Sequence, residues 1–287
     1  MPTLSLVRPD AKADPVVSGP RKIALDDVAI EFSARGQTVR AVDGVTLEVP
    51  DQQFLAVVGP SGCGKSTILN MVAGLLKPTS GQVDYDGSPV SGPNTKVGYM
   101  TQKDTLLPWR TVADNIGIAF ELRCRKERRA ERADRVAEMI ELIGLTGFER
   151  HYPAELSGGM RKRAALARML IYEPETLLLD EPFGALDAQL RLVMQQETLR
   201  LVERRQMTVI LVTHDLEEAI LMADRVAVFT ARPGRIRTVR DIPFARPRDP
   251  AELRFKPEFA AIHEELWNEL KQEFAASTAG DGVGDAH

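Results

Sequence analysis

A chain of 287 residues is long enough for one large domain, or for a domain with a subdomain, and it can bury a substantial core. Hydrophobic residues make up 44% of the chain and charged residues 27%, which argues against disorder of the whole chain. The 37 Lys and Arg against 41 Asp and Glu give a net charge of -4, so bulk charge offers no reason to expect nucleic acid as a partner. No apolar run approaches the roughly 18 residues of a membrane span.

The two ends of the chain are rich in turn-forming residues, and we expect residues 1–20 and about the last dozen residues to be flexible tails. The first twenty residues contain Pro and Asp where a signal peptide would have an apolar core, so the cytoplasm is the expected compartment. Two alternating runs within 23–50, separated by a polar turn, predict antiparallel strands. The apolar run at 54–59 predicts a buried strand that leads into a Gly-rich loop and a helix.

A helix is predicted over residues 119–145, because its apolar residues recur at i, i+3, i+4 and i+7 and form one face. These residues are Val136, Met139, Ile140 and Ile143. A basic cluster at 123–132 contains interleaved Glu residues and no aromatic residue on which a base could stack. We therefore interpret it as a solvated helix face rather than a nucleic-acid site.

Two short apolar runs, at 176–180 and 208–213, are separated by a helix, which is the pattern of an α/β parallel sheet. Near the C-terminus another helix has an apolar face that we expect to dock on the core. This face consists of Phe259, Ile262, Leu266 and Leu270. The two cysteines, Cys63 and Cys124, are too few for a disulfide framework and lack metal-ligand spacing, so both are predicted to be free thiols.

The segment GPSGCGKST, residues 59–67, matches the P-loop pattern G-x-x-x-x-G-K-[ST] and lies between a predicted strand and a predicted helix. Its glycines let backbone N–H groups converge on phosphate oxygens at a helix N-terminus. Lys65 is expected to neutralise the β- and γ-phosphates, and the Ser66 hydroxyl to hold Mg²⁺. The predicted phosphate-binding residues are Gly59, Pro60, Ser61, Gly62, Cys63, Gly64, Lys65, Ser66 and Thr67.

The apolar run at 177–179 ends in two carboxylates, Asp180 and Glu181. Successive strand positions point to opposite faces, so the two acids are expected to have separate roles. Asp180 is predicted to bind the Mg²⁺ shell, and Glu181 to orient and deprotonate the attacking water. A carboxylate pair at a strand end can instead cap a helix, but an intact P-loop in the same chain favours the catalytic interpretation.

A second phosphate-cradle-like segment, Ser157-Gly158-Gly159, lies nearly a hundred residues after the P-loop. Gln102 and His214 carry little information by themselves. Together with the P-loop, LLLDEP and Leu186-Asp187, however, these residues resemble in order and spacing the nucleotide-binding subunit of ATP-binding cassette (ABC) transporters. The resemblance covers about residues 22–240. It implies an α/β fold: a P-loop NTPase (RecA-like) core with a small antiparallel β-subdomain and an inserted α-helical subdomain.

The resemblance also assigns roles to residues. It implies that Phe32 stacks on adenine, that Gln102 contacts the metal and senses a membrane partner, and that His214 contacts the γ-phosphate of ATP. Asp187 is grouped with the nucleotide-binding residues, as are Ser157, Gly158 and Gly159. In this family the LSGG segment of one subunit closes over the γ-phosphate held by the P-loop of the other. Met160 stands where the common signature has Gln; backbone amides and Ser157 make the phosphate contact, so we expect the role to persist.

Besides the nucleotide-binding residues, the resemblance implies a catalytic set and a metal set. The catalytic set is Lys65, Gln102, Glu181 and His214, and the metal set is Ser66, Gln102 and Asp180. The implied cofactors are ATP and Mg²⁺. The implied organisation is a tail at 1–20, an ATP-binding domain at 21–245 with a helical subdomain at about 103–165, and a C-terminal helical extension and tail at 246–287.

Three segments look like the importer branch for nitrate, sulfonates, taurine and related solutes: 106–116, LSGGMRKR and ARPGRI at 231–236. The implied protein is an ATPase subunit at the cytoplasmic face of the inner membrane. Its implied partners are a second copy of itself, two integral-membrane permease subunits and, indirectly, an extracytoplasmic solute-binding protein, with no nucleic acid. The apolar triplet Leu107-Pro108-Trp109 in a loop is predicted to dock on the permease.

Two alternatives remain open. The first is a soluble ABC ATPase with a role outside transport, although the chain has neither a long coiled-coil insertion nor a second cassette. The second is a P-loop phosphotransferase acting on a small molecule. The LSGG segment and the paired Asp180 and Glu181 argue against the phosphotransferase.

Overall fold

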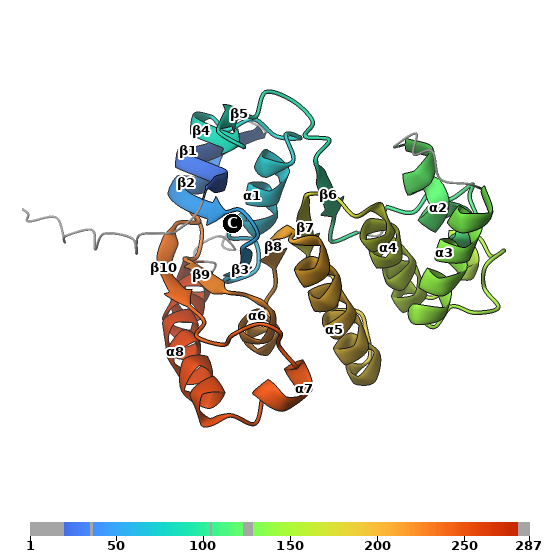
Figure 1. Cartoon of the computed structure of the whole chain (residues 1–287). Coiled ribbons are helices and arrows are strands. Elements are labelled where there is room, and N and C mark those ends of the chain that lie inside the picture. Colours follow the sequence, from blue (N-terminus) through green and yellow to red (C-terminus); the bar gives the residue numbers. More distant parts are fainter. Residues whose placement is uncertain (1–19, 35–36, 104, 123–128, 281–287) are drawn as a thin grey trace, which may run out of the picture.

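The computed structural model describes residues 20–34, 37–103, 105–122 and 129–280 of the chain. Most of the predicted N-terminal tail, Cys124 and the first part of the basic cluster lie outside the described residues. The described chain contains two sheets with helices packed around them, and α2, α3 and α4 gather at one end of the molecule, away from the small sheet (Figure 1).

The smaller sheet is antiparallel, as the alternating runs predicted, with the strand order β2-β1-β4-β5. Its strands are β1 (Arg21–Ala34), β2 (Gln37–Pro50), β4 (Ser80–Tyr85) and β5 (Ser88–Pro89). One face is buried, and near the hairpin end of β1 and β2 Phe32 stands opposite Val39. This register brings an aromatic and a branched apolar side chain together at the edge of the sheet.

The larger sheet has the order β10-β9-β3-β8-β7-β6 and is parallel except for β10. Its strands are β3 (Phe54–Val58), β6 (Val97–Met100), β7 (Thr176–Asp180), β8 (Thr208–Val212), β9 (Arg225–Phe229) and β10 (Ile236–Asp241). Every residue of β3, β7, β8 and β9 is buried, as expected of a parallel sheet covered on both faces. The loops after parallel strands meet at one edge, so the P-loop, Glu181 and His214 come together there.

The helices divide into three groups along the chain. Next to the larger sheet are α1 (Lys65–Val72), α5 (Ala188–Arg205) and α6 (Leu216–Met222). A helical group contains α2 (Val112–Leu122), α3 (Arg129–Leu142), the short 3-10 turn η1 (Pro153–Glu155) and α4 (Gly158–Tyr172). The chain then continues through α7 (Pro250–Leu253) and α8 (Pro257–Gly280), and α8 packs against α6.

Two sequence predictions need correction. Of the helix predicted over 119–145, the described residues 119–122 belong to α2 and 129–142 to α3, while 123–128 lie outside the described residues. The helix ends at Leu142 rather than at 145, and Ile143 lies just beyond α3 although its side chain is fully buried. Gly144 follows with φ of +63°, a left-handed conformation that favours glycine and ends helices. The predicted C-terminal tail begins too early, because α8 continues to Gly280.

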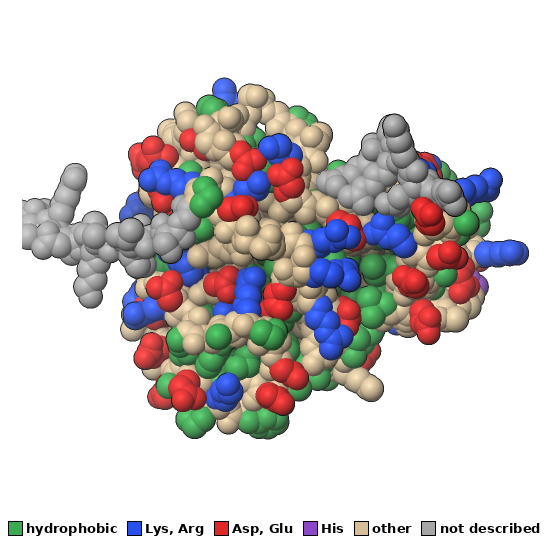
Figure 2. All heavy atoms as spheres, in the orientation of Figure 1, with side chains coloured by type: hydrophobic (Ala, Val, Ile, Leu, Met, Phe, Trp, Pro, Cys, Tyr) green, Lys and Arg blue, Asp and Glu red, His purple; other side chains and the backbone are tan. Residues whose placement is uncertain are grey.

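The predicted docking of the C-terminal helix is confirmed: Phe259, Leu266 and Leu270 of α8 are buried in the main core. On the face shown in Figure 2, basic and acidic side chains are interspersed over the surface. Among the helices that the structure describes, none is long and apolar enough to span a membrane.

Candidate nucleotide-binding site

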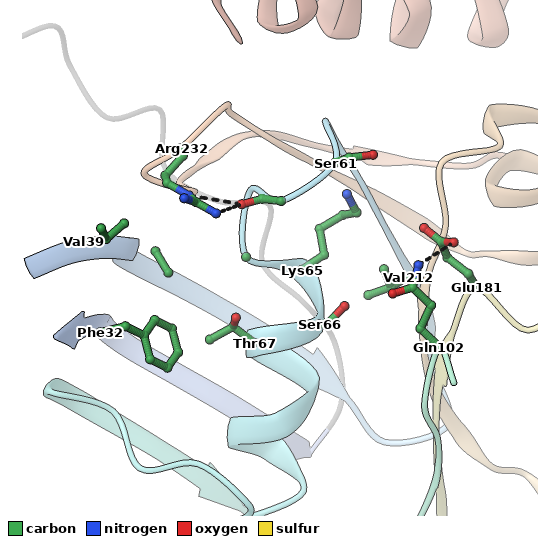
Figure 3. Close-up of a pocket in the computed structure, with 13 residues that line it drawn as sticks. Phe32, Val39, Ser61, Lys65, Ser66, Thr67, Gln102, Glu181, Val212 and Arg232 are labelled. Atoms are coloured by element: carbon green, nitrogen blue, oxygen red, sulfur yellow. Dashed lines mark hydrogen bonds between the residues drawn. The ribbon is translucent and has the colours of Figure 1, made fainter. Parts of the chain in front are cut away.

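A cavity of about 430 Å³ lies where the small sheet meets the P-loop edge of the larger sheet (Figure 3). It brings together side chains that are up to 200 positions apart in the sequence (Phe32 to Arg232, 232 − 32). Its lining residues are Phe32, Val39, Ala41, Ser61, Gly62, Gly64, Lys65, Ser66, Thr67, Gln102, Glu181, Val212 and Arg232. Nine of the positions predicted from the sequence are therefore found around one cavity.

One wall of the cavity is apolar. Phe32 is 44% exposed and its cross-strand neighbour Val39 is 40% exposed, so both present apolar surface to the cavity rather than to the core. Ala41 continues the same wall on β2. A flat aromatic face beside small apolar groups is suited to stacking against a nucleobase.

The P-loop forms the floor of the cavity, and its backbone requires glycine at two positions. Gly62 and Gly64 have φ of +73° and +103°, and a side-chain carbon at Gly64 would lie 2.7 Å from Val42 Cγ2. Three of the predicted phosphate-binding residues, Gly59, Pro60 and Cys63, do not line the cavity. Cys63 is a buried free thiol beneath the loop, and burial raises its pKa, so it packs as a neutral group.

Lys65 begins α1, and its ammonium group is held inside the loop. Nζ donates to the carbonyl oxygens of Gly59 and Pro60 at 2.8 and 2.7 Å, and the residue is only 6% exposed. These two carbonyls aim the charge at the space enclosed by the P-loop. A positive charge and the N-terminus of α1 therefore meet at the same place, which favours an anion.

Asp180 ends β7 and Glu181 follows it, and the two carboxylates have different surroundings. Asp180 is only 3% exposed, and burial raises its pKa, opposed by a hydrogen bond with Ser66 and by the nearby charges of Lys162 and Lys65. Ser66 and Asp180 thus bring a hydroxyl and a carboxylate oxygen together beside the P-loop. Mg²⁺ prefers oxygen ligands and often takes one or two carboxylates plus substrate phosphates, so this pair fits that ion.

Glu181 lines the cavity in a conformation that residues other than glycine rarely adopt, with φ of 49°. Its N–H donates to the Val212 carbonyl at 2.9 Å, which ties it to β8. The carboxylate accepts from Gln102 Nε2 at 3.3 Å and lies 3.3 Å from His214 Nδ1. The structure therefore brings Gln102, Glu181 and His214 together from three separate loops.

The second cradle lies outside this cavity. Ser157 caps α4 and its Oγ accepts from the Met160 N–H at 3.3 Å, while Ser157 and Gly158 are exposed. Asp187 caps α5 in the same way, accepting from the Leu190 N–H at 3.0 Å. None of Ser157, Gly158, Gly159 and Asp187 lines the cavity, so these four predicted residues are not brought to the P-loop of their own chain.

Two residues near the site received no role from the sequence. Lys162 of α4 donates from Nζ to the Gln102 carbonyl at 2.7 Å, which connects the helical group to the Gln102 loop. Arg232 donates to the Gly62 carbonyl of the P-loop at 3.0 Å. Arg232 belongs to the ARPGRI segment, so a signal was present, but its contact depends on a fold that joins segments 170 positions apart.

A P-loop at the carboxyl edge of a mainly parallel sheet, with a buried carboxylate at the end of β7 in that sheet, defines a P-loop NTPase. Residues 42–184 match the ABC transporter family. The chain is 43% identical over 257 residues to an uncharacterized ABC transporter ATP-binding protein of Methanocaldococcus jannaschii, a match covering 89% of this chain and 94% of that protein. The chain belongs to the ABC transporter family of ATP-binding proteins.

Relatives with more specific names are equally similar. The taurine import ATP-binding protein TauB of Pelagibacter ubique is 42% identical, over 82% of this chain and 90% of its own. The aliphatic sulfonates import ATP-binding protein SsuB 2 of Burkholderia cenocepacia is 44% identical, over 84% and 85%. A dimeric structure of an ATP-binding cassette in a post-hydrolysis state with ADP and Pi shares 29% identity at a TM-score of 0.71, covering 78% of this chain and 100% of that one.

Proposed function

We propose that this chain is the ATP-hydrolysing subunit of an importer for a small solute such as a sulfonate, taurine or nitrate. The observation that carries the proposal is the position of Glu181, whose carboxylate meets Gln102 and His214 at the end of the P-loop cavity. The import assignment is supported by the names of the taurine and aliphatic sulfonate relatives.

In this proposal Phe32 stacks on adenine, and the P-loop with Lys65 holds the β- and γ-phosphates. Ser66, Asp180 and Gln102 would hold Mg²⁺, which neutralises charge on the phosphate oxygens. Glu181 orients a water and takes its proton, while His214 holds the Glu181 carboxylate and contacts the γ-phosphate. Each of these side chains except the buried Asp180 and the exposed His214 lines the cavity.

The proposed assembly contains two copies of this chain. The dimeric state of the structural neighbour supports this arrangement, and so does the exposure of Ser157 and Gly158, which do not line the cavity of their own chain. The proposed membrane partners are two permease subunits, which place the ATPase at the cytoplasmic face of the inner membrane. A solute-binding protein would deliver the cargo to the permease from the other side.

The test is ATP-driven solute uptake by the purified chain reconstituted with its permease and binding protein in lipid vesicles. We expect phosphate release that is Mg²⁺-dependent and stimulated by the loaded binding protein. ATPase activity that the permease does not affect would support a soluble role instead. A phosphorylated small molecule, with no phosphate release, would indicate a phosphotransferase.

The loop before α2 gives a prediction about docking. Trp109 is 71% exposed. The backbone of its loop is fixed by Asn115, whose Oδ1 accepts from the Leu107 N–H at 2.7 Å. Replacing an interface Trp by Ala often costs about 2 kcal/mol or more of binding free energy. Trp109→Ala should therefore weaken permease binding by about tenfold or more. The ATPase activity and melting temperature of the isolated subunit should be unchanged, because the indole packs little against its own chain.

Phe255 is a matched control for this experiment, because it is 83% exposed and lies in a different region, between α7 and α8. Phe255→Ala should leave assembly with the permease intact. Co-purification of tagged permease with each variant measures the difference. Equal assembly by both variants would remove Trp109 from the docking surface.

A further inference from the structure

The loop between β9 and β10, residues 230–235, is pressed against the P-loop. The Gly234 N–H donates to the Ala41 carbonyl at 2.9 Å, and the Gly234 carbonyl accepts from the Asp43 N–H at 3.0 Å. A side-chain carbon at Gly234 would lie 2.0 Å from the Cys63 carbonyl oxygen of the P-loop. Only glycine allows so close an approach, so this loop has a defined position beside the phosphate-binding loop.

The C-terminal helix also holds this loop. The buried carboxylate of Glu273 on α8 accepts from the Ala231 N–H at 2.9 Å. Glu273 pairs in addition with Arg237 of β10. The residue next to Ala231 is therefore anchored from two sides, by β2 through Gly234 and by α8 through Ala231.

That residue is Arg232, and it lies at the mouth of the nucleotide cavity. Its Nη2 and Nε donate to the Gly62 carbonyl at 3.0 and 3.3 Å. Figure 3 places Arg232 on the side of the cavity where Val39 lies, whereas Glu181 lies on the other side of Lys65. A nucleotide with its base at the apolar wall and its γ-phosphate near Glu181 would bring its α-phosphate closest to Arg232.

Arg232 differs from the nearby Arg235 and Arg237 in having no carboxylate partner within the described residues. Arg235 pairs with Asp43, and Arg237 pairs with Glu269 and Glu273, but within the described residues no carboxylate pairs with Arg232. A guanidinium is always protonated and has five N–H donors, of which the Gly62 carbonyl takes two. An arginine that is held in place without a counter-ion is suited to bind phosphate oxygens.

We propose that Arg232 is a nucleotide-binding residue, whose guanidinium contacts the α-phosphate while it remains hydrogen-bonded to Gly62. This inference rests on the proposed function, because it requires a nucleotide in this cavity. ADP and ATP share the α-phosphate, so Arg232 strengthens the binding of both by the same factor. Through Glu273, the C-terminal helix positions this residue and so supports the nucleotide site.

The experiment measures the dissociation constants of ADP and of a non-hydrolysable ATP analogue by calorimetry on the purified full chain. Arg232→Gln keeps an N–H donor for the Gly62 carbonyl but removes the charge, and should raise both dissociation constants about tenfold. Arg232→Lys keeps the charge, and should raise them only about threefold. Arg240→Gln removes an exposed charge from β10, outside the cavity, and should leave both values unchanged.

The three variants separate a phosphate contact from simple support of the loop. If Arg232 only supported the loop, the Gln and Lys variants would have the same dissociation constants, or both variants would melt at a lower temperature than the wild type in the absence of nucleotide. Either result overturns the proposal. A Gln variant that binds as tightly as the wild type, or one that loses only the ATP analogue, also overturns it. If the wild type itself bound neither nucleotide, the proposed function would fail first.

Discussion

Replacing Glu181 with Gln is expected to lower ATP turnover by about 10² to 10⁴ while ATP binding is kept. The amide cannot accept the proton of the attacking water, but it has nearly the same shape and can still hydrogen-bond to Gln102 and His214. The P-loop and the apolar wall, which we propose to hold the nucleotide, do not include this side chain. Binding and hydrolysis should therefore separate in this variant.

Phosphate release and ATP binding are measured on the same purified protein, and chromatography in ATP then tests for a stable closed dimer. Glu138→Gln is the matched control, since Glu138 is an exposed carboxylate on α3 away from the cavity. This control should hydrolyse ATP at the wild-type rate. Turnover of Glu181→Gln at that same rate would remove Glu181 from the mechanism.

The parts of the fold that the sequence predicted well are those decided by local pattern. The runs at 54–58, 176–180 and 208–212 are short and mainly apolar, and each is a fully buried strand. The end of α8 was placed too early, because Ser277, Thr278 and Gly280 are weak helix formers that follow a strongly periodic segment. Weak propensity at the end of a docked helix is a poor guide to its last residue.

The site residues also divide into those that a local motif predicts and those that depend on contacts between distant segments. Ser61, Gly62 and residues 64–67 of the P-loop could be predicted to lie at one cavity because they belong to a single continuous segment. Gln102 and His214 could be found only through the resemblance to a family, because their contacts with Glu181 join segments 79 and 33 positions apart (181 − 102 and 214 − 181). The position of Arg232 at the cavity was missed because it depends on how β9, β10 and the P-loop pack, which no local pattern records.

The arrangement of Ser157 gives the second large expected effect, on heterodimers that carry one Lys65→Ala and one Ser157→Arg substitution. If Ser157 serves the ATP of the opposite chain, placing the two substitutions on different chains damages one site twice and leaves the other intact. Placing both on one chain, beside a wild-type partner, damages both sites. We therefore expect the first heterodimer to keep substantially more ATPase activity than the second.

The comparison is balanced because both heterodimers contain the same two substitutions. Loss of the Ser157 cap costs α4 about 1 kcal/mol in either arrangement, so a difference in activity cannot come from that destabilisation. Chains with different tags, purified through both tags, exclude homodimers. Cooperativity between sites lowers activity in both arrangements but does not reverse their order.

The opposite order would mean that each chain uses its own Ser157, since only the second heterodimer contains an undamaged chain. The structure makes that outcome unexpected, because Ser157 and Gly158 are exposed at the start of α4 and neither lines the cavity of their own P-loop. An exposed helix N-terminus such as that of α4 is suited to bind an anion that is brought to it. A second copy of the chain, with ATP on its own P-loop, would bring that anion, so one site would need both cradles.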